Sequence, residues 1–281
     1  MLVPPAAETI FNLGPLPVTN TMINAWIAVL FFIFLAFSLR RLQTRVPRGL
    51  QNIVEAITEF MQSEVQKVTG DEKRAALFLP VVGSIFLFIL FSNWLGLMPG
   101  TGSIGIWEFH HGSQILVPFL RPAASDWNLT LAIAAFAVIM SHYYGVRALG
   151  LSNHFSKFIN FRGIYRAVKH GPMAVVVAMI EFGVGLIEIV SEIAKITSLS
   201  LRLFGNIFAG EVLITVMLGL FAFFVPIPFM FLELLVGVIQ ATVFAMLTLA
   251  YLTVATSSHE NEDQAEHETQ KEQPIALKVQ S

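Results

Sequence analysis

Ionisable side chains interrupt the most apolar part of the chain, between residues 172 and 256. They are Glu181, Glu188, Glu192, Lys195, Arg202, Glu211 and Glu233. A charged side chain inside a membrane span costs about 2.5–3.5 kcal/mol on insertion scales, so such residues usually line a path for ions or protons. Carboxyl groups can bind and release protons, whereas an arginine keeps its charge and can only attract an anion. The residue types therefore predict a proton path that contains an arginine.

Four polar residues spaced seven positions apart follow one face of a predicted helix, and two more fall close to the same line. The six are Glu181, Glu188, Lys195 and Arg202, with Glu192 and Asn206 beside them. At about 100° per residue, a step of seven returns to nearly the same side of a helix. A polar stripe in lipid must face water, another protein or both.

A second stripe, made of small residues, lies beside the polar one. It consists of Ser191, Ser198, Gly205 and Ala209. Small residues let another helix approach closely inside a membrane. The stripe therefore predicts either a partner helix packed over Arg202 or packing against the chain's own helices, and the spacing leaves both open.

The composition indicates which class of protein holds these residues. Of 281 residues, 55% are hydrophobic and only 13% are charged, whereas a soluble domain has about 25% charged residues. So few charges cannot cover a soluble surface, which excludes a soluble enzyme, a disordered chain and a nucleic-acid-binding protein. The absence of cysteine excludes disulfides, iron–sulfur ligation and a thiol nucleophile. We expect an all-α polytopic membrane protein.

Apolar stretches of about 20 residues, long enough to span a bilayer, predict about five membrane helices in a single membrane domain. The predicted spans are 22–39, 76–98, 129–146, 172–224 and 228–256. The third closes with His142, Tyr143 and Tyr144, which are typical of interfacial anchors. Between the first two spans, apolar residues at helical spacing over about 50–69 predict an amphipathic helix on the membrane surface. A packed soluble helix is the alternative.

The tract 172–224 is too long for one upright helix. As a helix it would extend roughly 75 Å, against a hydrocarbon core of about 30 Å. It is therefore either two spans with a turn between them or one steeply tilted helix. Its middle has no proline, and no glycine before Gly205, so we favour the tilted helix.

The distribution of basic residues predicts the orientation in the membrane. Segments 40–74 and 147–169 contain twelve Lys and Arg residues, whereas the loop between the second and third spans has only Arg121. Basic loops lie in the cytoplasm, so segment 1–21 is expected outside. The acidic tail 257–281 is expected in the cytoplasm, without a fixed structure.

A turn at Pro226 makes the last two predicted helices an antiparallel hairpin. Folding there brings Glu211 near Glu233 and Gln240 near Arg202. Two carboxyl groups at one depth cannot both ionise cheaply, so one of them is expected to hold a proton. The pattern therefore predicts two polar paths, one from each side of the membrane, that meet at Arg202.

Two segments strongly resemble subunit a of the rotary F-type ATP synthase: residues 198–213, SLSLRLFGNIFAGEVL, and residues 240–252, QATVFAMLTLAYL. The resemblance implies a stator channel in a bacterial cell membrane, beside a rotating ring of small hairpin proteolipid subunits. It also implies peripheral-stalk subunits, no cofactor and no catalytic site of its own. Proton coupling is expected, although in this family the ring subunit largely decides between proton and sodium.

The resemblance also implies roles for individual residues. Arg202 matches the family's essential arginine, and Ser198 lies one turn before it. The residues that match the family's outer half-channel are Asn206, Glu211, Glu233 and Gln240. Glu188 matches the cytoplasmic path, and the residues that support it are Glu192, Lys195 and Glu181. Glu233 departs from the best-known bacterial members, which carry a histidine there. That departure makes the proton affinity of the outer path an open question.

Two other functions compete with this hypothesis. A secondary transporter also has charges within its spans, but such proteins usually show two similar halves, and here the ionisable residues gather in one. An intramembrane enzyme would need a motif that is missing: there is no H-E-x-x-H, and 101–105 (TGSIG) departs from G-x-S-x-G. Adjacent His110 and His111 are expected to be loop residues, so no metal site is predicted.

Overall fold

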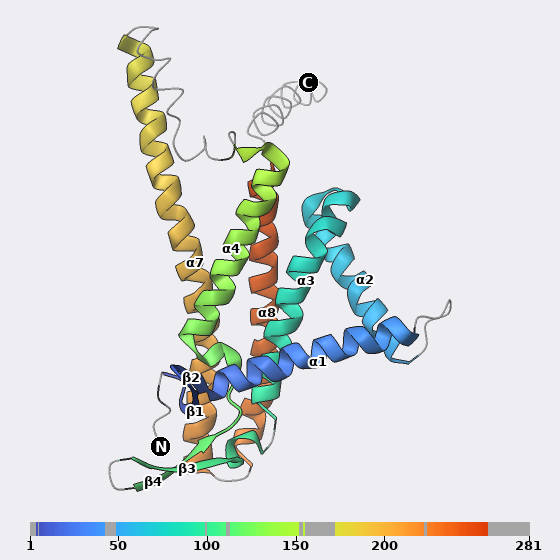
Figure 1. Ribbon diagram of the computed structural model, residues 1–281, viewed down its shortest axis with the longest axis vertical. Helices are drawn as coiled ribbons and strands as arrows, with labels where there is room; N and C mark the ends of the chain where they lie inside the picture. The colour runs from blue at the N-terminus through green and yellow to red at the C-terminus, as the bar shows by residue number, and fades with distance from the viewer. Residues whose placement is uncertain are drawn as a thin grey trace, which may run out of the picture. The chain divides into compact units, whose positions relative to one another are not determined.

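The computed structural model describes residues 4, 6–42, 49–98, 100–110, 113–151, 154, 172–221 and 224–257. Long helices dominate these residues (Figure 1). They are α1 (Asn20–Leu42), α2 (Leu50–Thr69), α3 (Glu72–Gly96), α4 (Trp127–Leu149), α7 (Pro172–Leu220) and α8 (Pro226–Thr256). Two 3-10 turns, η1 (Thr101–Ser103) and η2 (Ala123–Ser125), lie between α3 and α4.

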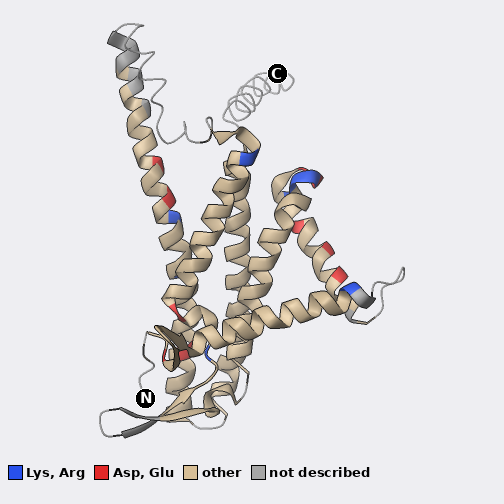
Figure 2. Cartoon of the chain, in the orientation of Figure 1, with Lys and Arg blue, Asp and Glu red and all other residues tan. Residues whose placement is uncertain are grey.

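Five of these helices are long and apolar enough to cross a membrane. The candidate spans are Asn20–Arg40, Glu72–Gly96, Trp127–Leu149, Phe182–Leu220 and Pro226–Thr256. Charged residues are sparse along α1, α3, α4 and α8 and gather where α2 meets α3 (Figure 2). The expectation of an all-α polytopic membrane protein is confirmed. After residue 257 the predicted acidic tail lies outside the described residues. Parts of the two basic segments, 40–74 and 147–169, also lie outside them.

The long apolar tract forms one uninterrupted helix. Helix α7 has 49 residues, which corresponds to about 74 Å at 1.5 Å per residue, so the alternative of two spans with a turn is wrong. The helix ends at Leu220, and Pro226 opens α8. Proline suits a first helical position because the amide it lacks would have had no partner there.

The chain forms two compact units, residues 1–137 with 194–249, and residues 138–193 with 250–281. In the first unit, α3 packs against α1 and α2, and the indole Nε1 of Trp94 donates a hydrogen bond to the Leu234 carbonyl of α8 at 3.1 Å. Within this unit α1 runs across the direction of α7 and α8 (Figure 1).

Helix α2 divides its apolar residues between two environments. Met61 and Val65 are buried, and the Met61 side chain reaches α3 at Gly83, whereas Ile53, Ile57 and Phe60 are exposed. Gly70 in a left-handed conformation ends α2, and the Asp71 side chain caps α3 by accepting a hydrogen bond from the Lys73 amide. Contact of the exposed apolar residues with a membrane surface stays a prediction.

Two short antiparallel β-hairpins supplement the helices, and the hydrophobic patterns did not predict them. They are β1 (Thr9–Leu13) with β2 (Leu16–Thr19), and β3 (Gly105–His110) with β4 (Ser113–Pro118). The first hairpin leads directly into α1. The backbone amide of Asn20, the first residue of α1, donates a hydrogen bond to the Glu8 carbonyl oxygen at 3.1 Å. The hairpin thereby holds the segment before α1 near the site described below.

Candidate functional site

Helix α7 has one buried face and one open face in the first unit. On the buried face, Leu199, Leu203 and Ile207 are 1–2% exposed. Three small residues of the stripe are exposed in this unit, namely Ser198, Gly205 and Ala209, and Ser191 is exposed in the second unit. The described residues leave the small-residue stripe exposed, which favours the alternative of a partner helix.

Arg202 lies on the open face of α7. Its side chain is exposed, as is that of Asn206 one turn later. Within the described part of the chain Arg202 makes no ion pair or side-chain hydrogen bond, and Gln240 of α8, which is half-buried, does not bind it. A guanidinium at membrane depth needs water or a carboxylate, so this face suits a partner that brings one.

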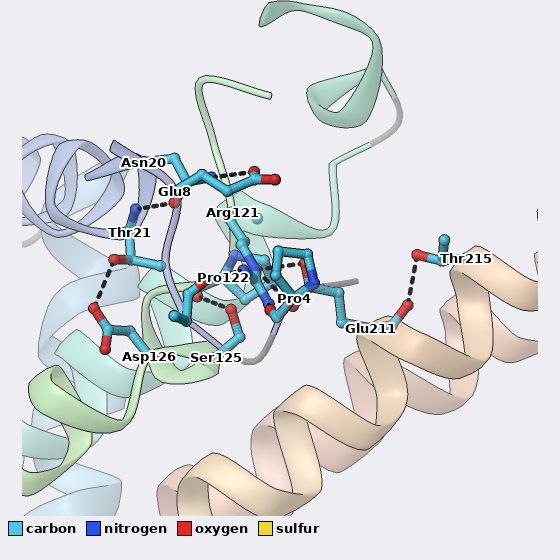
Figure 3. A network of polar contacts seen from close by, with 12 residues as sticks. Pro4, Glu8, Asn20, Thr21, Arg121, Pro122, Ser125, Asp126, Glu211 and Thr215 are labelled. Carbon is cyan, nitrogen blue, oxygen red and sulfur yellow. Dashed lines mark hydrogen bonds and ion pairs between the residues drawn. The ribbon is translucent and has the colours of Figure 1, made fainter. Parts of the chain in front are cut away.

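Glu211, on the same helix, forms an ion pair that the sequence patterns did not predict. The Nε of Arg121 lies 2.7 Å from Glu211 Oε1 and donates to Oε2 at 2.9 Å. The Arg121 side chain is 2% exposed and that of Glu211 is 18% exposed. Figure 3 shows Arg121 reaching α7 from the loop that follows β4. The ion pair ties α7 to the loop that follows β4.

Main-chain contacts hold Arg121 in place. Its Nη1 donates to the Ala6 carbonyl at 3.3 Å and its Nη2 to the Pro4 carbonyl at 3.0 Å. The side chain of Asn24 on α1 donates in turn to the Arg121 carbonyl at 2.7 Å. The segment before α1 therefore takes part in positioning the arginine that binds Glu211.

Neighbouring polar contacts tie the same loop to the start of α1 (Figure 3). The hydroxyl of Thr21 donates to Asp126 Oδ2 at 3.1 Å, and the Asn20 amide group donates to Glu8 Oε2 at 3.2 Å. Asp126 also caps α4, since its Oδ1 accepts from the Asn128 amide at 2.9 Å. These bonds fix the loop that carries Arg121 relative to α1 and α4.

Glu233 of α8 lies directly against α7 beside Glu211. Its side chain is 5% exposed, and a Cβ on Gly210 would overlap its carboxyl oxygens. Glu211 and Glu233 are close enough to repel each other when both are ionised. Within the described residues, Glu233 Oε1 is buried without a hydrogen-bond partner. The hairpin thus brings the two carboxyl groups together, as folding at Pro226 predicts.

Asn93 of α3 is a further polar residue beside this pair that the sequence patterns missed. It is fully buried, and neither polar atom of its side chain has a partner among the described residues. It packs against α8 at Gly237, one turn after Glu233 and one turn before Gln240. Buried amides ordinarily bind protein groups or water, so this position suits a water chain along α8.

The second unit holds the remaining acids of the polar stripe. Glu188 and Glu192 are half-buried on α7, and only the backbone of Glu181 is described. Glu192 Oε2 lies 3.5 Å from Nε2 of His142 on α4. His142 therefore does more than anchor the end of a span. Lys195, which belongs to the first unit, is half-buried as well.

Residues 22–253 match the family described as ATP synthase A chain. Curated relatives named ATP synthase subunit a include one from Moorella thermoacetica, 31% identical over 250 residues that cover 89% of this chain and 96% of the relative. Others come from Gloeobacter violaceus (34% identical, 89% of both chains) and Mycobacterium ulcerans (36% identical, 86% of this chain and 89% of the relative). The chain belongs to the ATP synthase subunit a family. It is thus a multi-pass membrane subunit of an ATP synthase complex that takes part in proton transport.

Because members of this family take part in proton transport, proton pumping can test whether the close contact between Gly210 and Glu233 matters. Gly210→Ala should lower ATP-driven proton pumping at least about tenfold, because overpacking a tight contact costs about 1–3 kcal/mol and would displace the Glu233 carboxyl group. Gly219→Ala on the same helix is the matched control, since a Cβ there meets nothing within 4 Å. Acidification of inverted membrane vesicles measures both. Equal pumping by the two variants would show that the close contact is not needed.

Proposed function

We propose that this chain is the stator of a rotary ATP synthase and carries protons to and from carboxyl groups on a rotating ring of hairpin proteolipid subunits. Arg202 separates an inlet path from an outlet path. The observation that carries the proposal is the open face of α7, where Arg202 stands exposed beside Ser198 and Gly205. A ring helix that packs on these small residues would bring its carboxyl group to the guanidinium.

The inlet path runs along the α7–α8 hairpin. Its members are Asn206, Glu211, Glu233 and Gln240, to which we add Arg121 and Asn93 from the contacts described above. Glu211 and Glu233 share one site, and a pair of carboxyl groups that cannot both ionise cheaply is suited to holding one proton. The proton then passes along α8 toward Gln240 and the ring carboxyl group.

The outlet path lies on the N-terminal part of α7. It contains Glu188, with Glu192, Lys195 and Glu181 in supporting positions on the same stripe. Once neutral, a ring carboxyl group can rotate through lipid because the cost of a buried charge is removed. On meeting the outlet it loses its proton, because Arg202 favours the carboxylate. The arginine itself cannot relay a proton, so it blocks direct leakage between the paths.

The energy for synthesis comes from the membrane and not from this subunit. Each proton that crosses releases about 2.3 kcal/mol per 100 mV, so several must combine for one ATP in the catalytic head. We infer that the chain is non-catalytic and uses no cofactor. Its N-terminus would lie outside a bacterial cell membrane and its C-terminus in the cytoplasm, with peripheral-stalk subunits as further partners.

Cysteine cross-linking tests the contact with the ring directly, because the chain has no cysteine of its own. Gly205→Cys and Ala209→Cys should each form a disulfide with a cysteine placed beside the ring carboxyl group in the assembled complex. Leu203→Cys, on the buried face of α7, is the control and should form none. Failure of both exposed positions to cross-link in assembled complexes would contradict the proposed ring-facing surface.

A further inference from the structure

Three titratable side chains of the second unit lie in a line from α7 to the segment after α4. His142 on α4 is the central one. Its Nε2 lies 3.5 Å from Glu192 Oε2, and its Nδ1 lies 3.2 Å from Nε2 of His154. Each ring nitrogen of His142 therefore faces a different proton-binding group. A neutral imidazole can accept a proton at one nitrogen and give one up from the other.

Local packing explains how His154 comes so close to α4. A Cβ on Gly145 would lie 2.6 Å from the ring carbon Cε1 of His154 and 2.8 Å from the Ala255 carbonyl oxygen of α8. Because glycine has no Cβ, the His154 ring can lie against the helix, where it is 3% exposed. The two histidine rings then meet edge to face, with centroids 5.4 Å apart.

The exposure of the three groups differs along the line. His142 is 32% exposed and Glu192 is 17% exposed at their side chains, whereas His154 is buried. The distance from His142 to Glu192 exceeds that of a hydrogen bond by about half an ångström, which a small side-chain movement removes. The line thus joins an acid of the polar stripe of α7 to a buried histidine beyond α4.

We propose that Glu192, His142 and His154 form a proton relay that extends the outlet path from α7 into α4, an inference that rests on the proposed function. The protonated carboxyl group of Glu192 gives its proton to His142 Nε2. At the same time the proton on His142 Nδ1 passes to His154 Nε2, so that Glu192 becomes a carboxylate and His154, which keeps its own Nδ1 proton, becomes an imidazolium. One proton moves in total, no electron is transferred, and rotation of the His142 ring restores its starting tautomer.

Chemical rescue with imidazole tests the relay in the assembled complex. His142→Ala should slow ATP-driven pumping at least about fivefold, since a positioned proton-transfer group commonly contributes more than that. Added imidazole, which can occupy the space left by the side chain, should restore at least half of the rate. The readout is membrane potential reported by an oxonol dye, because a permeant base would collapse a pH gradient. Tyr143→Ala, at an exposed neighbour, is the matched control.

Several outcomes would overturn the relay. Normal pumping by an assembled His142→Ala complex, or slow pumping that imidazole does not change, excludes proton transfer through this ring. Where His142→Ala does not assemble, His142→Gln decides, because it keeps hydrogen bonding but cannot pass a proton: slow pumping supports the relay and normal pumping excludes it. Arg202→Ala, measured in parallel, separates failure of the relay from failure of the proposed function. Continued pumping by that variant would contradict the proposed function itself.

Discussion

Arg202→Ala should abolish ATP-driven proton pumping while the complex still assembles. The side chain is exposed and makes no ion pair or side-chain hydrogen bond within the described residues, so its removal leaves no buried partner unpaired. In the proposed mechanism, what is lost is the charge that draws the proton off a ring carboxyl group. Losing one preorganised charge-stabilising group typically costs a factor of about 10²–10³. We therefore expect pumping to fall at least about a hundredfold.

Passive proton leak through inverted membrane vesicles that contain the Arg202→Ala complex distinguishes the two roles proposed for Arg202, which are drawing off the proton and keeping the two paths apart. If the arginine also keeps the inlet and outlet apart, leak through Arg202→Ala should exceed that of the parent complex. Arg147→Ala, which removes an exposed arginine at the end of α4, is the charge-matched control and should pump normally. Pumping at the parent rate by Arg202→Ala would disprove the half-channel mechanism at its centre.

Arg121→Met should destabilise the subunit and reduce the amount of assembled complex. The change leaves the Glu211 carboxylate without the buried guanidinium that pairs with it. Removing one partner of a buried ion pair costs about 3–5 kcal/mol. It also removes the two hydrogen bonds to the carbonyls of Pro4 and Ala6. Thermal unfolding of the purified complex and the quantity of the subunit in membranes both measure the effect.

The double variant Arg121→Met with Glu211→Gln separates structure from transport. A neutral amide no longer needs the guanidinium, so stability should recover by more than half, whereas pumping should stay low because Gln cannot carry a proton. Arg74→Met is the control for loss of an ion pair, since Arg74 and Asp71 are 3.9 Å apart and about half exposed. Exposed pairs contribute about 0–1 kcal/mol. An equal effect of Arg74→Met and Arg121→Met would contradict a structural role for the buried pair.

The amino-acid sequence alone determined the class of protein, the helices and the family. Apolar stretches set the positions of the five candidate spans, because the thickness of a bilayer requires long apolar helices whatever their packing. The motif around Arg202 was sufficient to predict the family, and the turn at Pro226 was sufficient to predict that Glu211 and Glu233 meet. These features depend on local composition and spacing, which can be counted along the chain.

Only the tertiary structure decided which face of α7 is covered and which polar residues reach the site from elsewhere. The stripe of small residues was compatible with two kinds of packing until the burial of Leu199, Leu203 and Ile207 showed the chain's own core on the other face. Arg121 is the only Lys or Arg residue of the loop between the second and third spans, and that isolation was a usable signal. Its contact with Glu211 spans 90 positions. Spacing along one helix predicts which residues share a face, but a contact between distant segments depends on how loops and helices pack, which no local pattern records.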